Sequence, residues 1–160
     1  MTWSPIRKIL AALDESPRAP LVFETATSLA RQLNAEVILL RVVSVPPDLP
    51  PAAHTHPDHL EETLELRAVD ELQRLAAAAP GVQFSTPVAV EGDPWRQILA
   101  VATAQDVDLI VLGSHGYHGL DRVLGTVAAK VVNHADRDVL VVHARRAPPP
   151  AAAPPRNQSG

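Results

Sequence analysis

One strand-to-helix junction decides the fold of this chain, and it reads LIVLGSHGYHGLDRVLGTVAAKVVNHA over residues 109–135. Its opening run, Leu109–Leu112, is uniformly apolar, which is typical of a strand buried on both faces of a parallel sheet. A glycine-rich segment follows, and from Thr126 to about Ala135 the apolar residues recur with helical spacing. The junction therefore predicts a strand, a loop and a helix in direct succession.

The same alternation extends outwards from this junction. Five short apolar runs are the predicted strands: Ile9–Leu13, Val37–Val43, Val88–Val90, Leu109–Leu112 and Val139–Val142. Helical spacing between them predicts the buried faces of three more helices: Val22, Ala26, Leu29, Ala30 and Leu33; Leu60, Leu64, Ala68, Leu72, Leu75 and Ala79; and Trp95, Ile98, Leu99 and Ala102. Asp93 and Pro94 suit the N-cap and first turn of the last of these helices. Because strands that alternate with helices join by right-handed parallel crossovers, we expect a Rossmann-like α/β fold, an open five-stranded parallel sheet with helices on both faces.

Length and composition limit the class of protein. The chain has 160 residues, about one domain, and its lack of cysteine fits a reducing compartment. A net charge of −4 without a basic stripe, and an aromatic content of 3%, argue against nucleic-acid partners. The amino terminus carries no export signal, and no apolar run reaches the length of about 18 residues that a membrane span needs. We therefore expect a cytoplasmic protein with no nucleic-acid or membrane partner.

Two proline-rich stretches interrupt the pattern. Residues 46–59 hold five prolines and predict a loop, while residues 147–160 are of low complexity and predict a disordered tail. The folded domain is therefore expected over residues 4–146. His54, His56 and His59 resemble a metal-binding cluster by composition, but they lack cysteine partners and helical spacing, so no metal site is expected there.

Two strand ends carry residues suited to a ligand, because ligands of open parallel sheets bind beyond the carboxyl ends of the strands, where the strand order reverses. The first strand finishes at Asp14, which either has a binding role, orienting a ligand or holding a divalent ion through water, or caps the segment that begins near Ser16. The fourth strand runs into residues 113–125, which hold four of the chain's seven glycines. The free N–H groups of the next helix, with Thr126 as N-cap, and the hydroxyls of Ser114 and Thr126 suit a phosphate. The alternative is a glycine-rich turn that only connects a strand to a helix.

Several segments resemble the universal stress protein family. They read ILAALD at 9–14, VILLRV at 37–42, DLIVLGSHG at 108–116, GLDRVLGTVA at 119–128 and DVLVV at 138–142. The resemblance spans residues 5–144. It implies a five-stranded parallel sheet with four helices, of the adenine nucleotide alpha hydrolase-like type, in the family's ATP-binding subgroup.

The resemblance also implies a binding site and a partner. Residues around the adenine and ribose would be Ala12, Asp14, Val42 and Leu112, and those holding the ribose and phosphates would be Gly113, Gly116, Gly125, Thr126 and Val127. Leu13, Ser114, His115 and Gly119 complete the expected binding set. The expected cofactor is ATP, with or without magnesium. Family members dimerise through the last strand, which implies a homodimer through Val139, Leu140, Val141 and Val142.

The chain departs from the family signature at one place. The ATP-binding subgroup has G-x2-G-x9-G followed by Ser or Thr, whereas here eight residues separate Gly116 from Gly125. This keeps open a stress-protein module that binds no nucleotide and acts by dimerisation and partner binding. The spacing is neither a Walker A loop nor a G-x-G-x-x-G fingerprint, and no G-x-S-x-G elbow is present. We therefore expect a nucleotide-dependent switch or regulator with no catalytic residues, and at most slow ATP hydrolysis.

Overall fold

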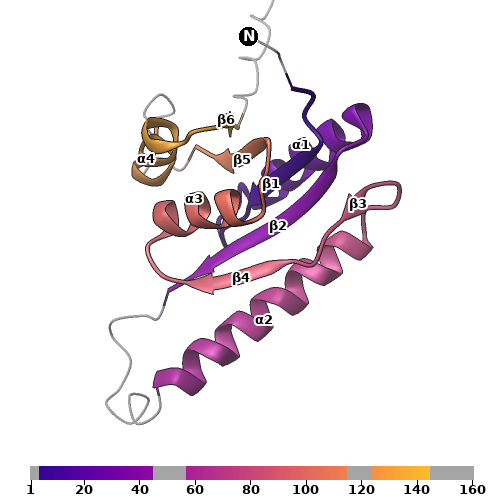
Figure 1. Ribbon diagram of the computed structural model, residues 1–160. Coiled ribbons are helices and arrows are strands. Elements are labelled where there is room, and N and C mark those ends of the chain that lie inside the picture. Colours follow the sequence, from indigo (N-terminus) through magenta and orange to yellow (C-terminus); the bar gives the residue numbers. More distant parts are fainter. Residues whose placement is uncertain (1–3, 45–56, 115–123, 145–160) are drawn as a thin grey trace, which may run out of the picture.

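A parallel sheet with helices on both faces forms the body of the computed structural model (Figure 1). The structure describes residues 4–44, 57–114 and 124–144. The strands are β1 (Lys8–Ala12), β2 (Glu36–Val43), β3 (Gln83–Phe84), β4 (Val88–Glu91), β5 (Leu109–Gly113) and β6 (Asp138–Val142). The helices are α1 (Ala19–Leu33), α2 (Pro57–Ala77), α3 (Pro94–Ala104) and α4 (Thr126–His134). The predicted α/β fold class is confirmed.

The sheet has the strand order β3-β2-β1-β5-β6, and every pair of neighbours is parallel. β4 also pairs with β2, further along the same edge as β3. The five predicted strands are all present, and the structure contains one further short strand, β3, that the sequence pattern did not predict. Pro87 separates β3 from β4, since proline has no N–H to donate to a sheet ladder. From β1 the chain adds strands on one side and then returns to β5 on the other, so the strand order reverses between β1 and β5.

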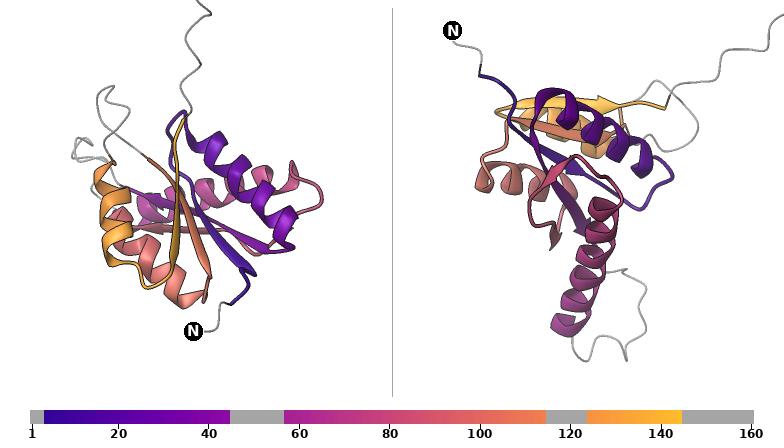
Figure 2. Two further views of the ribbon diagram at one scale, coloured as in Figure 1. Left: turned by 90° about the horizontal axis from the view of Figure 1, so that it is seen from above. Right: turned by 90° about the vertical axis from the view of Figure 1, so that its right-hand side faces the viewer.

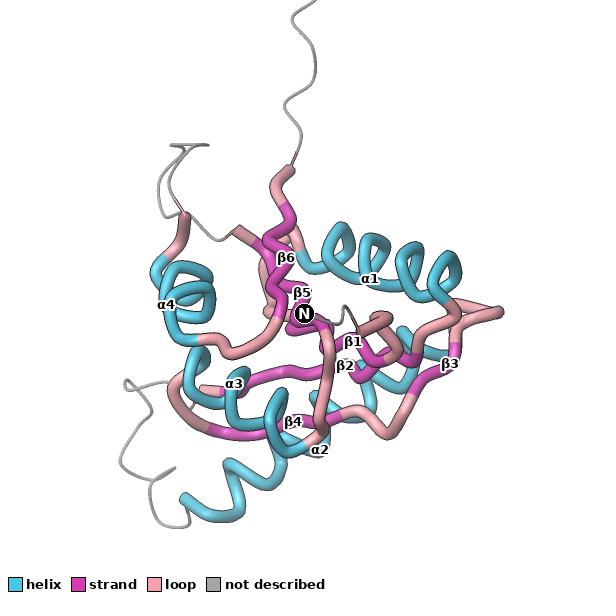
Figure 3. The backbone as a smooth tube through the Cα atoms, turned by 45° about the horizontal axis from the view of Figure 1, so that its top comes forward, coloured by secondary structure: helices cyan, strands magenta, loops and turns pink. Residues whose placement is uncertain are grey.

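Alternate side chains of the strands enter two separate cores. Ile9, Ala11 and other residues of one face pack with α1 and α2, through residues such as Ala26 and Leu72. Leu10 and its counterparts on the other face pack with α3 and α4. The left view of Figure 2 shows α1 on one side of the strands and α3 and α4 on the other. Figure 3 shows the same arrangement of helices around the sheet. The middle strands are therefore covered on both faces, as their continuous apolar runs require.

The ends of the helices differ in detail from the sequence-based expectations. Leu33 was expected in the core but is 42% exposed, because it is the last residue of α1 and Asn34 turns the chain away with a left-handed φ of 53°. Helix α2 begins at Pro57, inside the predicted loop, since proline suits a first helical turn. Asp93 is the N-cap residue of α3 as predicted, but its carboxylate makes no capping bond and instead approaches Arg96, with 3.6 Å between Oδ2 and Nε.

Some expectations fall beyond the described part of the chain. The predicted tail at 147–160 lies outside the described residues, as do His54 and His56 of the histidine cluster and the side chain of His59. Among the described residues, no three His, Cys, Asp or Glu side chains are grouped to hold a metal ion. No helix of the described chain has the length and apolar character needed to cross a membrane.

Candidate functional site

A cavity of about 200 Å³ opens at the carboxyl ends of β1, β2 and β5, on the face covered by α3 and α4. Its lining residues are Ala12, Leu13, Asp14, Leu40, Val42, Pro94, Ile98, Leu112, Gly113 and Val127. It lies at the reversal of the strand order, because the helices that follow β1 and β5 in the chain, α1 and α4, pack on opposite faces of the sheet. The wall is mostly apolar, and the carboxylate of Asp14 is the ionisable group among the lining residues.

The cavity brings together seven residues of the expected binding set from four separate segments: Ala12, Leu13, Asp14, Val42, Leu112, Gly113 and Val127. Sequence reasoning missed Leu40, Pro94 and Ile98. The signal for Leu40 was available, because it lies two residues before Val42 and therefore on the same face of the strand. Pro94 and Ile98 reach the cavity only because α3 packs over the end of β2.

The phosphate side of the expected set is described in part. His115, Gly116 and Gly119 lie outside the described residues. The prediction that Thr126 is the N-cap of α4 is wrong by one residue: Gly125 is the N-cap, in an extended conformation, and Thr126 is the first helical residue. Glycine is itself an accepted N-cap type, so the sequence alone did not distinguish the two positions. Gly125 provides no side-chain cap, and the first turn of α4 contains no acidic residue.

Asp14 shapes the chain as well as lining the cavity. One carboxylate oxygen of Asp14, Oδ1, accepts hydrogen bonds from the backbone N–H and the hydroxyl of Ser16, at 3.0 and 2.6 Å. The hydroxyl oxygen of Ser16 in turn accepts a bond from the backbone N–H of Arg18, at 3.3 Å. Both expected roles are thus compatible with the geometry, because the carboxylate orders the turn into α1 and still borders the cavity.

Ser114 follows β5 directly and is almost completely buried, with 3% of its surface exposed. Its N–H donates to the carbonyl of Val142 at 2.9 Å, and its own carbonyl accepts a hydrogen bond from Nη1 of Arg18. The same Nη1 lies 3.4 Å from the Ser114 hydroxyl. Arg18 was missed by sequence reasoning, since nothing in the local pattern links two residues 96 positions apart.

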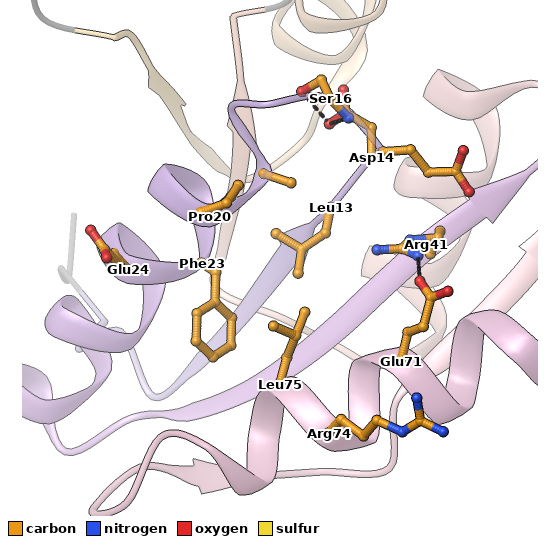
Figure 4. Close-up of a pocket in the computed structure, with 12 residues that line it drawn as sticks. Leu13, Asp14, Ser16, Pro20, Phe23, Glu24, Arg41, Glu71, Arg74 and Leu75 are labelled. Atoms are coloured by element: carbon orange, nitrogen blue, oxygen red, sulfur yellow. Dashed lines mark hydrogen bonds and ion pairs between the residues drawn. The ribbon is translucent and has the colours of Figure 1, made fainter.

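A larger cavity of about 730 Å³ lies on the opposite face of the sheet, between α1 and α2 (Figure 4). Leu13, Phe23 and Leu75 surround its apolar part, and Arg41 reaches it from β2 and forms an ion pair with Glu71 of α2. Size alone would favour this cavity. The smaller cavity is the better candidate, because it lies at the strand-order reversal and borders the glycine signature at Gly113.

These features define a class: a doubly wound α/β protein with a ligand crevice at the switch point of its parallel sheet. The chain belongs to the universal stress protein family, whose model matches residues 5–143. It is 33% identical over 138 residues to universal stress protein A homolog 1 of Coxiella burnetii, which covers 85% of this chain and 95% of that protein. The resemblance inferred from the sequence motifs is therefore confirmed.

Solved structures of other family members have the same fold. The universal stress protein UspA from Lactobacillus plantarum matches with a TM-score of 0.69 and 28% identity, over 88% of this chain and 99% of that one. A universal stress protein in complex with cAMP matches with a TM-score of 0.63 and 23% identity, over 88% of this chain and 98% of that one.

Proposed function

We propose that this chain binds an adenine nucleotide, with ATP as the first candidate, at the carboxyl ends of β1, β2 and β5. The observation that carries the proposal is the convergence of seven expected residues around one cavity. Small-molecule sites are concave, mostly apolar, and contain a few polar groups that fix orientation. The walls formed by Val42, Leu112 and Val127 suit the faces of a purine ring, and Asp14 suits the ribose hydroxyls.

The volume of the cavity suggests which part of the nucleotide lies inside it and which part lies outside. Its volume of about 200 Å³ is below the range of roughly 300–1,000 Å³ that is usual for ligand sites. We therefore assign this cavity to the base, with the sugar and phosphates extending past Gly113 towards the start of α4. The N-cap Gly125 has no side chain to cap α4 and the first turn of α4 contains no acidic residue, so the positive end of the helix dipole favours an anion there.

We propose that the nucleotide acts as a signal rather than a substrate, so that the protein is a nucleotide-dependent switch or regulator of the stress response in the cytoplasm. Slow ATP hydrolysis is a variant that a phosphate-release assay tests. Another family member forms a complex with cAMP, itself an adenine nucleotide, but its 23% identity supports the fold alone. The ligand is therefore proposed from the residues of this cavity.

Mass spectrometry of nucleotide released from gently purified protein, followed by calorimetric titration with ATP, ADP and AMP, tests the proposal. We expect a co-purified adenine nucleotide or saturable heat with at least one of the three. An absence of both, in the presence of magnesium, would contradict nucleotide binding.

The second candidate function is a module that binds no nucleotide and acts by dimerisation and partner binding. The eight-residue spacing between Gly116 and Gly125, one shorter than the family signature, favours it. A folded, dimeric protein that gives no heat with any adenine nucleotide would support this function in place of the first.

A further inference from the structure

A series of hydrogen bonds crosses the carboxyl edge of the sheet from the end of β1 to the end of β5. It begins at Asp14, whose carboxylate accepts both bonds from Ser16, as drawn in Figure 4. It continues from Ser16 to the backbone of Arg18, and the Arg18 guanidinium then reaches Ser114. The two strand ends that flank the proposed nucleotide site are thus connected through the start of α1.

Arg18 bonds to the two oxygens of Ser114, while the sheet bonds to its N–H. The Ser114 N–H still bonds to β6 through the carbonyl of Val142, at 2.9 Å. Its carbonyl and hydroxyl face Arg18 instead, and Ser114 is 3% exposed. A buried carbonyl without a partner costs free energy comparable to a lost hydrogen bond, so the guanidinium fixes this residue in place.

The positive charge of Arg18 can also attract the phosphates of a bound nucleotide. Both of its side-chain hydrogen bonds in the described chain go to neutral oxygens of Ser114, and none of the ion pairs found among the described residues involves Arg18. A guanidinium keeps its charge at every physiological pH. Ser114 is also the second residue of the signature that begins at Gly113, so the charge lies where the proposed phosphate-binding segment starts.

From this geometry we infer that Arg18 is a positioning and specificity-determining residue of the nucleotide site. It holds Ser114 at the start of the glycine signature, and its charge favours phosphorylated nucleotides over the uncharged nucleoside. The inference rests on the proposed function, because it concerns the same site.

Calorimetric titration of the full chain with ATP and with adenosine tests the inference. Arg18→Gln keeps a hydrogen-bond donor but removes the charge, and we expect it to weaken ATP binding about tenfold, the size of one partly screened charge pair. Adenosine binding should change less than about twofold, since adenosine carries no charge to be attracted. Arg18→Lys restores the charge and should return ATP affinity to within about threefold of the wild type.

Arg31→Ala is the matched control, because Arg31 lies near the end of the helix that Arg18 precedes, is exposed, and in the described chain donates a hydrogen bond to the carbonyl of Pro80 at 3.4 Å. It should bind both ligands as the wild type does.

Equal losses of ATP and adenosine affinity in Arg18→Gln would show a purely structural role and overturn the inference, as would no loss at all. Should Arg18→Gln fail to fold, Arg18→Met, which also removes the charge and keeps the length of the side chain, is measured for the same ATP-to-adenosine ratio. A wild type that binds neither ligand overturns the proposed function and this inference together, whereas a wild type that binds ATP isolates the inference.

Discussion

At the scale of single residues, Asp14 shows how one side chain serves two neighbouring regions. It lines the small cavity on the α3/α4 face and the large cavity on the α1/α2 face, and it orders the turn through Ser16. A substitution of Asp14 would therefore alter the backbone as well as the candidate site. Residues that line the small cavity without shaping a turn give a cleaner test, and Val42 is the best of them.

Val42→Trp should reduce ATP affinity at least tenfold, because an indole in place of the isopropyl group fills the space proposed for the base. A void of about 200 Å³ leaves no room for both rings. Calorimetric titration measures the loss. Val43→Trp is the control, since the neighbouring residue on a strand faces the other side of the sheet. Unchanged ATP binding in Val42→Trp would place the base elsewhere.

At the scale of elements, Arg137 connects the start of β6 to α3 and to the segment between α3 and β5. It lies at the amino ends of the strands, whereas the candidate site lies at their carboxyl ends. Its Nη1 donates to the carbonyls of Ala102 and Val107, at 2.7 and 3.0 Å. The hydrogen bond and charge of Arg137 also hold the pKa of Asp136 below its ordinary value. This cluster secures the amino end of β6 without contributing to the candidate site.

Arg137→Ala should lower the free energy of unfolding by about 1–3 kcal/mol, because the carbonyls of Ala102 and Val107 each lose a hydrogen bond from a charged donor. Urea denaturation measures the change. Arg96→Ala is the comparison, since Arg96 is exposed and its pair with Asp93 spans 3.6 Å, and it should cost less than about 1 kcal/mol. Equal effects in the two variants would contradict the structural role of Arg137.

Prediction from the sequence succeeded for elements whose pattern is local. The strands buried on both faces are continuous apolar runs, and the sheet and its switch point follow from their alternation with helices. Gln83–Phe84 escaped detection because two residues that pair at an edge carry no periodic signal. The contact of Arg18 with Ser114 escaped because it depends on how α1 docks against β5.

At the scale of the whole molecule, β6 forms one edge of the sheet and has one neighbouring strand, β5, in the described chain. Val139, Leu140 and Val141 are half-buried in one copy of the chain. A free strand edge with apolar side chains is suited to pairing with a second copy. We therefore retain the homodimer through β6 as a proposal.

Light scattering coupled to gel filtration should give the mass of a dimer, and Val141→Lys should shift the protein towards the monomer by placing a charge at the paired edge. Leu66→Lys is the control, because Leu66 lies on α2 and is already 61% exposed. Thermal unfolding verifies that both variants are folded. A monomeric wild type, or a dimer insensitive to Val141→Lys, would contradict the proposed interface.

We propose that an adenine nucleotide occupies the small cavity at the switch point and leaves the larger cavity between α1 and α2 empty. Backbone amide NMR spectra recorded during an ATP titration test it most directly. We expect saturable shifts of the amides of Ala12, Val42 and Leu112, with those of Phe23 and Leu75 nearly unchanged. Shifts confined to Phe23 and Leu75, or no shifts at any ATP concentration, would contradict it.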